Sequence, residues 1–129
     1  MGKSSAAAAI EVEIDEDVDA RPVIDLVHLS RQTCGDSALE SELLRLFANQ
    51  AQQIAARIDE EPLPGDGSWR ADLAHRLKGS ARAVGAFPLS DAAEAYEQYV
   101  RANAPELTDA QNRLAEAIER ARGAIRQLL

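Results

Sequence analysis

The sequence predicts an all-α fold: an antiparallel up-and-down four-helix bundle with a short N-terminal helix that caps one end. Residues that lose little rotamer freedom in helices (Ala, Leu, Glu, Arg and Gln) are abundant, whereas aromatic residues make up only 4% of the chain. Apolar residues also recur at helical spacing along most of the sequence. A length of 129 residues suits one domain.

The first residues are expected to form a flexible acidic tail, residues 1–21. Six acidic residues fall between Glu11 and Asp19, and this composition buries too little apolar surface to order itself. The apolar run before them is too short for a secretory signal, so nothing here predicts export or anchoring. Pro22 marks the start of the folded domain, which we place at residues 22–129.

The first two helices are predicted from stop and cap residues beside an apolar pattern. A short helix over about 24–33 ends before Gly35. A long second helix begins at a cap formed by Asp36 or Ser37. Its apolar stripe, which should face the core, consists of Leu39, Leu43, Leu46, Phe47, Ile54 and Ile58.

The remaining helices are separated by prolines and glycines. The stretch 62–68 is a turn that returns the chain antiparallel, and the third helix runs over about 69–84, where Gly85 ends it. Pro88 suits the first turn of a fourth helix, which extends to about residue 102. The last two helices should bury Leu89, Ala92, Ala93, Tyr96 and Val100, then Leu107, Leu114, Ile118, Ile125 and Leu128. Four such helices complete a bundle within one chain, which favours a monomer.

The candidate site lies on the third helix at His75. Histidine is the side chain whose ordinary pKa lies closest to neutrality, and the sequence has only His28 and His75. At about 100° per residue, the apolar side chains of this helix lie about 160–180° away from His75. These side chains are Leu73, Leu77 and Val84. His75 is therefore expected to point into solvent, whereas His28 is expected to be a surface or packing histidine.

Three residues share the predicted face of His75. Lys78, Gly79 and Arg82 fall within about 60° of it, one and two turns toward the C-terminus. An exposed imidazole nitrogen can attack a phosphorus centre, and nearby cations stabilise the added negative charge. Gly79 leaves room for a partner's active site, at a cost of roughly 1 kcal/mol of helix stability. A chance glycine beside an ordinary surface histidine is disfavoured because all four residues share one face.

The stretch HRLKGSARAVGAFPLSDAAEAYE resembles the signature of histidine-containing phosphotransfer (HPt) domains, whose core reads H-x-L-K-G-[SA] followed by a glycine. The resemblance covers about residues 22–129 and implies a four-helix bundle. It implies that His75 is the phosphoryl acceptor, that Lys78 lies near the phosphoryl oxygens, and that Gly79 permits docking. Arg82 falls where the family varies, so its electrostatic support of the site is inferred from helix geometry alone.

A member of this family would be a phosphocarrier of a two-component phosphorelay. Its partners would be receiver domains of response regulators and hybrid histidine kinases, which exchange the phosphoryl group through an aspartate. The chain has no phosphate-binding glycine loop and no metal-ligand pattern, so no cofactor of its own and no ATPase or kinase activity are expected. Mg²⁺ is expected on the partner receiver.

Composition argues against other partners. A net charge of −8 disfavours nucleic acid, whose phosphates need a dense basic face. No apolar stretch is long enough to span a bilayer, and a cytoplasmic protein is expected. Two alternatives stay open: a phosphoacceptor domain excised from a larger histidine kinase, and a helical adaptor without phosphoryl chemistry. The kinase alternative is opposed by Arg76, because kinase dimerisation helices typically carry an acid after the histidine. Glu94 and Glu97 are expected to make ordinary surface pairs with Arg101.

Overall fold

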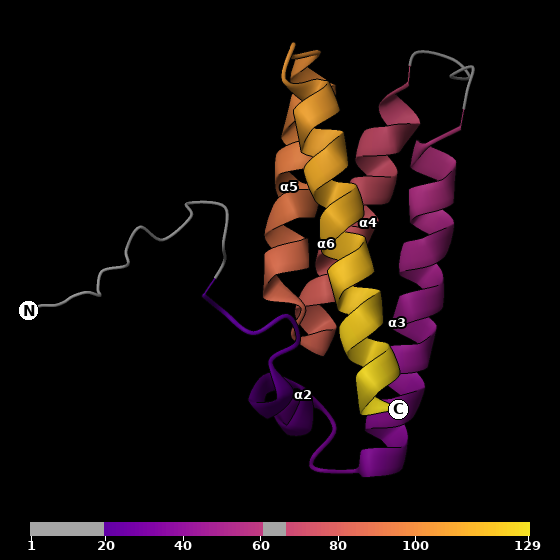
Figure 1. Ribbon diagram of the computed structural model, residues 1–129, viewed down its shortest axis with the longest axis vertical. Coiled ribbons are helices and arrows are strands. Elements are labelled where there is room, and N and C mark those ends of the chain that lie inside the picture. The colour runs from indigo at the N-terminus through magenta and orange to yellow at the C-terminus, as the bar shows by residue number, and fades with distance from the viewer. Residues whose placement is uncertain (1–19, 61–66) are drawn as a thin grey trace, which may run out of the picture.

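The computed structural model describes residues 20–60 and 67–129, which form five α-helices. Helices α3 to α6 run up and down side by side, and the short α2 lies at one end of them (Figure 1). The helices are α2 (Leu26–Gln32), α3 (Ser37–Ile58), α4 (Ser68–Val84), α5 (Phe87–Ala102) and α6 (Leu107–Leu128). The predicted all-α up-and-down bundle with a short N-terminal capping helix is confirmed.

Two of the segments predicted from sequence fall mostly outside the described residues. Of the acidic tail at 1–21, residues 1–19 are outside, and of the turn at 62–68, residues 62–66 are outside. The tail and the division of the chain at residue 22 therefore stay predictions.

The helix ends follow the local chemistry that the sequence indicated. Asp36, rather than Ser37, caps α3: its side chain accepts a hydrogen bond from the backbone N–H of Leu39 at 3.1 Å. Asp25 caps α2 in the same way through the N–H of His28. Gly85 ends α4 in the left-handed conformation, at φ +86°, which an L side chain rarely adopts.

The short helix α2 is fastened to the corner between α4 and α5. The backbone N–H of Asp25 donates to the carbonyl of Gly85 at 2.8 Å, and Leu29 is fully buried. The ring of His28 meets the ring of Phe87 edge to face, with centroids 5.1 Å apart. The prediction that His28 is a surface or packing histidine is confirmed.

The core runs the length of the bundle and is built from small and branched apolar side chains around Tyr96. Its members from the four long helices are Leu44, Phe47, Ala51, Ile54, Ile58, Ala74, Leu77, Ala81, Val84, Leu89, Ala93, Tyr96, Ala110, Leu114, Ile118, Ala121 and Ile125. Packing of this kind fixes the relative position of the helices, and therefore of any side chain on their outer faces.

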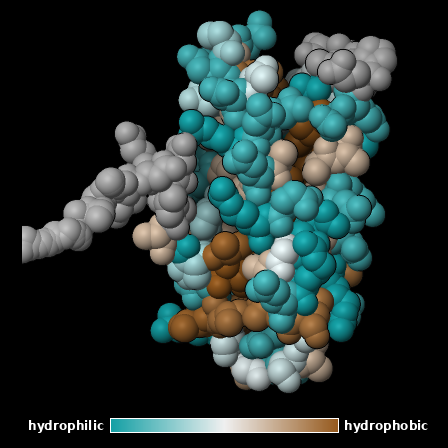
Figure 2. Space-filling view, in the orientation of Figure 1, coloured by the Kyte–Doolittle hydropathy of each residue, from teal (hydrophilic) through white to brown (hydrophobic). Residues whose placement is uncertain are grey.

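Three leucines that the sequence assigned to the core are exposed. Leu39 and Leu46 on α3 are 43% and 56% exposed, and Leu128 on α6 is 44% exposed. At about 100° per residue, Leu39 and Leu46 lie about 80–100° from Phe47, at the edge of the buried stripe, whose other side is filled by Leu44. Leu128 falls in the last turn of α6. Leu26 and Val27 of α2 are also exposed, and Figure 2 shows a band of apolar surface at the end of the bundle where α2 lies.

Among the described residues, no helix has both the length and the apolar character needed to cross a membrane.

Candidate functional site

His75 lies on the outer face of α4, opposite the side chains that this helix buries. Its side chain is 63% exposed, whereas Ala74 and Leu77 on the inner face are completely buried. The predicted orientation of the third helix is therefore confirmed: its apolar stripe enters the core and the imidazole faces solvent.

The inner edge of the imidazole is held by Glu97 of α5. Nδ1 of His75 lies 3.1 Å from Oε2 and 3.2 Å from Oε1 of this carboxylate. The side chain of Glu97 is only 12% exposed, so it is enclosed between the two helices. The expected pairing of Glu97 with Arg101 is confirmed, but the pair is not an ordinary surface pair, because the α4–α5 contact buries Glu97 and turns it toward His75.

Two basic side chains converge on the same carboxylate. Nζ of Lys78 lies 3.7 Å from Oε1 of Glu97, and Arg101 donates to Oε2 through Nε at 3.2 Å and Nη2 at 3.1 Å. Arg101 also reaches back to α4, where Nη2 lies 3.3 Å from Oδ1 of Asp72. Glu97 is thus the centre of a charged cluster that ties α5 to the helix carrying the histidine.

These contacts determine the charge of Glu97. Burial by itself would raise the pKa of Glu97, but hydrogen bonds from His75 and Arg101, with the charges of His75 and Lys78, outweigh burial and lower the pKa. The carboxylate is therefore ionised at neutral pH and can only accept hydrogen bonds. It follows that the proton of a neutral His75 ring resides on Nδ1, which leaves the lone pair of Nε2 directed away from Glu97.

The other predicted site residues lie on the same face but differ in their surroundings. Gly79 is exposed, and a Cβ added to it would meet no atom within 4 Å, so packing does not require glycine there. Arg82 is 56% exposed and lies 3.7 Å from Glu94, apart from the cluster around Glu97. The expected pairing of Glu94 with Arg101 is wrong, since Glu94 faces Arg82 of α4 instead.

The sequence pattern of the Hpt domain family matches residues 42–124, which is more than half of the chain. The chain belongs to the Hpt domain family. Membership implies a role in phosphotransfer within a phosphorelay, and Hpt domains exchange the phosphoryl group with receiver domains. Neither a curated protein nor a solved structure matches the chain significantly.

The matched range of the Hpt domain contains the whole cluster around His75 and most of the bundle, from the first turns of α3 to the last turns of α6. It does not include α2. Beside His75 the surface forms a shallow depression of about 420 Å³, lined by Asp72, His75, Arg76, Glu97 and Arg101. Two guanidinium groups, of Arg76 and Arg101, therefore border the space next to the imidazole.

Sequence reasoning missed Glu97 and Arg101 because both belong to α5, and helical phase relates only residues of one helix. A signal was available nonetheless. In an antiparallel pair joined by a tight corner at Gly85, residues about equally far from the corner lie at the same height, and His75 and Glu97 are nearly so placed. The described residues contain no cluster of three or more His, Cys, Asp or Glu side chains able to hold a metal ion.

Proposed function

We propose that His75 accepts a phosphoryl group on Nε2 from the aspartyl phosphate of one receiver domain and passes it to the aspartate of another. One observation carries this proposal: His75 is an exposed imidazole whose Nδ1 is held by the ionised carboxylate of Glu97. This contact leaves Nε2 as the free nucleophile.

The forward step needs no proton to move. The Nε2 lone pair of His75 attacks phosphorus, the bond between phosphorus and the aspartyl oxygen breaks, and the receiver's carboxylate leaves with the electron pair. The ring, which keeps its proton on Nδ1, becomes positively charged. Glu97, already in contact with that N–H, stabilises the new charge, much as a buried aspartate stabilises the imidazolium in the Ser-His-Asp triad of proteases. The reverse step regenerates the same neutral ring.

Cations near the imidazole would stabilise the transferred group. Lys78 lies one turn along α4 from His75 and is anchored to Glu97, so its ammonium is held close to the ring. Arg76 and Arg101 border the depression beside the ring. Charge-assisted hydrogen bonds from such groups favour the phosphoryl oxygens, which carry most of the negative charge. Arg82, engaged with Glu94, would contribute less.

The receiver domain would complete the chemistry. Its active site must reach the imidazole directly, and the open space over Gly79 supplies that access. We expect the Mg²⁺ that assists the transfer to be bound by the receiver, and we expect this chain alone to have no kinase activity. Receivers of response regulators and of hybrid histidine kinases are both candidate partners.

The proposal is tested by mixing the chain with a receiver domain that carries radiolabelled phosphate. Label is expected to appear on the chain in a form that is labile in acid and stable in base, as a phosphorylated imidazole is. His75→Gln should accept no label. His28→Gln is the matched control, because it removes the other histidine, which packs against Phe87, and it should accept label like the unchanged chain.

Equal labelling of His75→Gln and the unchanged chain would show that His75 is not the phosphoryl acceptor. Labelling from ATP in the absence of any partner would contradict the expectation of a carrier without kinase activity.

A further inference from the structure

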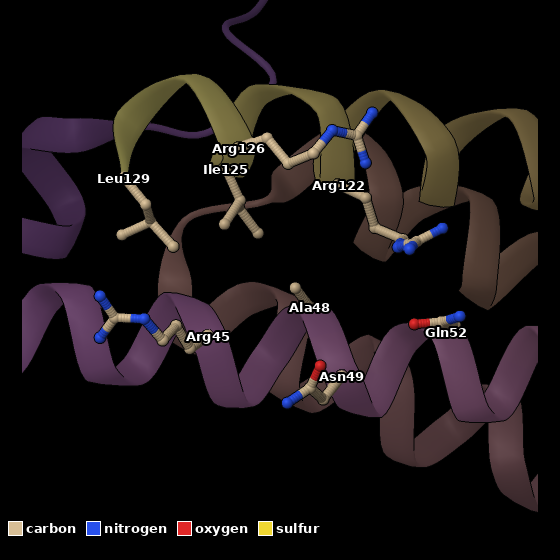
Figure 3. Close-up of a pocket in the computed structure, with 8 residues that line it drawn as sticks. All are labelled: Arg45, Ala48, Asn49, Gln52, Arg122, Ile125, Arg126 and Leu129. Carbon is tan, nitrogen blue, oxygen red and sulfur yellow. The ribbon is translucent and has the colours of Figure 1, made fainter.

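A second charged hollow lies on the seam between α3 and α6, away from the helices that carry His75 and Glu97. It has a volume of about 270 Å³. Figure 3 shows side chains of the two helices facing each other across it. The lining residues are Arg45, Ala48, Asn49, Gln52, Arg122, Ile125, Arg126 and Leu129, and we call this hollow the arginine groove.

The arginine groove is basic in a protein whose net charge is −8. Three guanidinium groups border it and no carboxylate side chain does, while Asn49 and Gln52 add polar amides. Its apolar surface comes mainly from Ala48, which is too short to fill the seam, and from the exposed Leu129, while the buried Ile125 forms its floor. A ligand that fits must therefore offer several negative charges together with some apolar surface.

The three guanidinium groups are available to such a ligand. Arg45 and Arg122 lie 3.9 Å and 2.8 Å from Glu42 and Glu119, each within one turn of the same helix. Pairs of this kind on the surface contribute little stability, so an anion can displace them at small cost. Within the described part of the chain, Arg126 forms no ion pair.

We propose that the arginine groove binds the first part of the acidic segment of the same chain, residues 10–15. This part, IEVEID, has the required chemistry, because three carboxylates alternate with the apolar Ile10, Val12 and Ile14. The carboxylates pair with the three guanidinium groups, and the apolar side chains cover Ala48 and the exposed Leu129. Because segment and groove belong to one molecule, binding needs only modest intrinsic affinity.

The connection is long enough. Nη2 of Arg21 lies 2.7 Å from Oδ2 of Asp91, near the start of α5, which brings the chain to the end of the bundle where α6 finishes. The groove is lined by the last turns of α6 and is therefore at the same end. From Arg21 to the groove the chain has to pass one neighbouring helix, a distance of about 10–20 Å. The six residue steps from Arg21 back to Asp15 span about 20 Å when extended, which leaves residues 10–15 to lie in the groove.

The experiment uses the full chain with a nitroxide attached at Ala9→Cys, in a Cys34→Ser background that leaves no other thiol. Paramagnetic broadening of backbone amide signals by NMR reports which surface the label approaches. At low ionic strength, the amides of Asn49, Gln52 and Ile125 are expected to broaden. At about 1 M salt, where the Debye length is about 3 Å, the broadening should vanish.

Charge-reversal variants test whether the acidic segment binds the groove specifically or is attracted to positive charge anywhere on the surface. Arg45→Glu with Arg126→Glu is expected to weaken the contact about tenfold and to remove most of the broadening. The control is Arg113→Glu with Arg120→Glu, which changes the net charge equally at two exposed arginines of α6 outside the groove, and it should keep the broadening. No broadening at the groove amides, or broadening that survives reversal in the groove, would overturn the proposal. Broadening that grows with protein concentration would also overturn it, by showing that the segment binds a second copy.

Discussion

Nδ1 of His75 lies 3.1 Å from Oε2 of Glu97, and this contact connects an exposed ring on α4 to a buried carboxylate on α5. Arg101, one turn further along α5, donates hydrogen bonds to the same carboxylate and to Asp72 of α4. The contact therefore orients the ring and favours a proton on Nδ1 before any partner arrives. This preorganisation is the main feature that the structure adds to the exposed histidine recognised in the sequence.

Replacing Glu97 with Gln should reduce the loss of unfolding free energy that the chain undergoes when the pH is lowered into the acid range. The pKa of Glu97 is lower in the folded chain than its ordinary value of 4.5, so on acidification the unfolded chain takes up this proton first. The contribution of Glu97 to the free energy of unfolding is then complete above about pH 4.5 and is lost as the pH falls further. Urea unfolding between neutral pH and about pH 3 should show a smaller loss for Glu97→Gln.

Glu116→Gln is the control for this comparison, since Glu116 is an exposed carboxylate on α6. Its stability curve should follow that of the unchanged chain. At neutral pH, Glu97→Gln should also be less stable by about 1–2 kcal/mol, because it weakens hydrogen bonds between charged groups. A curve for Glu97→Gln that is parallel to the unchanged chain at acid pH would show that Glu97 is not held ionised by its neighbours.

Filling Gly79 should stabilise the fold and slow phosphotransfer. An added Cβ at Gly79 meets no atom within 4 Å, so Gly79→Ala should raise the free energy of unfolding by about 0.5–1 kcal/mol. Gly79→Gln should also fold, yet its side chain should obstruct the approach of a receiver to His75. Circular dichroism during urea unfolding measures the first effect, and the rate of labelling from a phosphorylated receiver measures the second.

Gly123 provides the matched control, because it also lies within a helix, where an added Cβ would make only ordinary contact with Arg126 at 3.7 Å. Gly123→Ala should stabilise the bundle by a similar amount and leave the labelling rate unchanged. If Gly79→Gln transfers at the native rate, the docking role of Gly79 is wrong.

The positions of residues around the helix axis predicted the part of the site that lies on α4, but not the part that lies on α5. The order of apolar residues around one helix axis defines its buried side, so the exposure of His75 and its grouping with Lys78 and Gly79 could be read from the sequence. The role of Glu97 could not be read from the sequence, because it depends on the rotation and height of α5 relative to α4. These are set by packing around residues such as Tyr96, not by the pattern of α5 alone.

The edges of the core stripes were predicted less well than their centres. Phe47 and Ile54 are buried as expected, while Leu39 and Leu46 are exposed although they continue the same helical spacing. A leucine about 80–100° from the centre of the stripe is buried only if a neighbouring helix covers that side. Spacing alone therefore cannot decide its burial.

Lys78 and Arg82 should differ in their effect on transfer. Lys78 is held 3.7 Å from Glu97, close to His75, whereas Arg82 is held 3.7 Å from Glu94, away from it. Lys78→Ala should slow labelling about tenfold, equivalent to about 1.4 kcal/mol of lost stabilisation of the phosphoryl charge, and Arg82→Ala should slow it much less. Labelling rates of folded variants measure both effects, and equal losses would show that only the local density of positive charge matters.

Gly35, which follows the end of α2, and Gly85, which ends α4, should respond differently to alanine. Both have positive φ, +78° for Gly35 and +86° for Gly85, so each Gly→Ala change strains the backbone by about 1 kcal/mol or more. At Gly35 nothing lies within 4 Å of the added Cβ, so backbone strain should be the whole cost of Gly35→Ala. At Gly85 the Cβ would lie 2.7 Å from the carbonyl oxygen of Asp25, so the chain entering α2 must move.

That movement would also disturb the hydrogen bond from the N–H of Asp25 to the carbonyl of Gly85 and the packing of His28 on Phe87. Gly85→Ala should therefore lower the free energy of unfolding by about 2–4 kcal/mol, compared with about 1 kcal/mol for Gly35→Ala. Urea unfolding measures both losses, and the NMR signals of the His28 ring report whether α2 has left its place. Similar losses for the two variants would mean that α2 shifts without resistance and contributes little to the stability of the bundle.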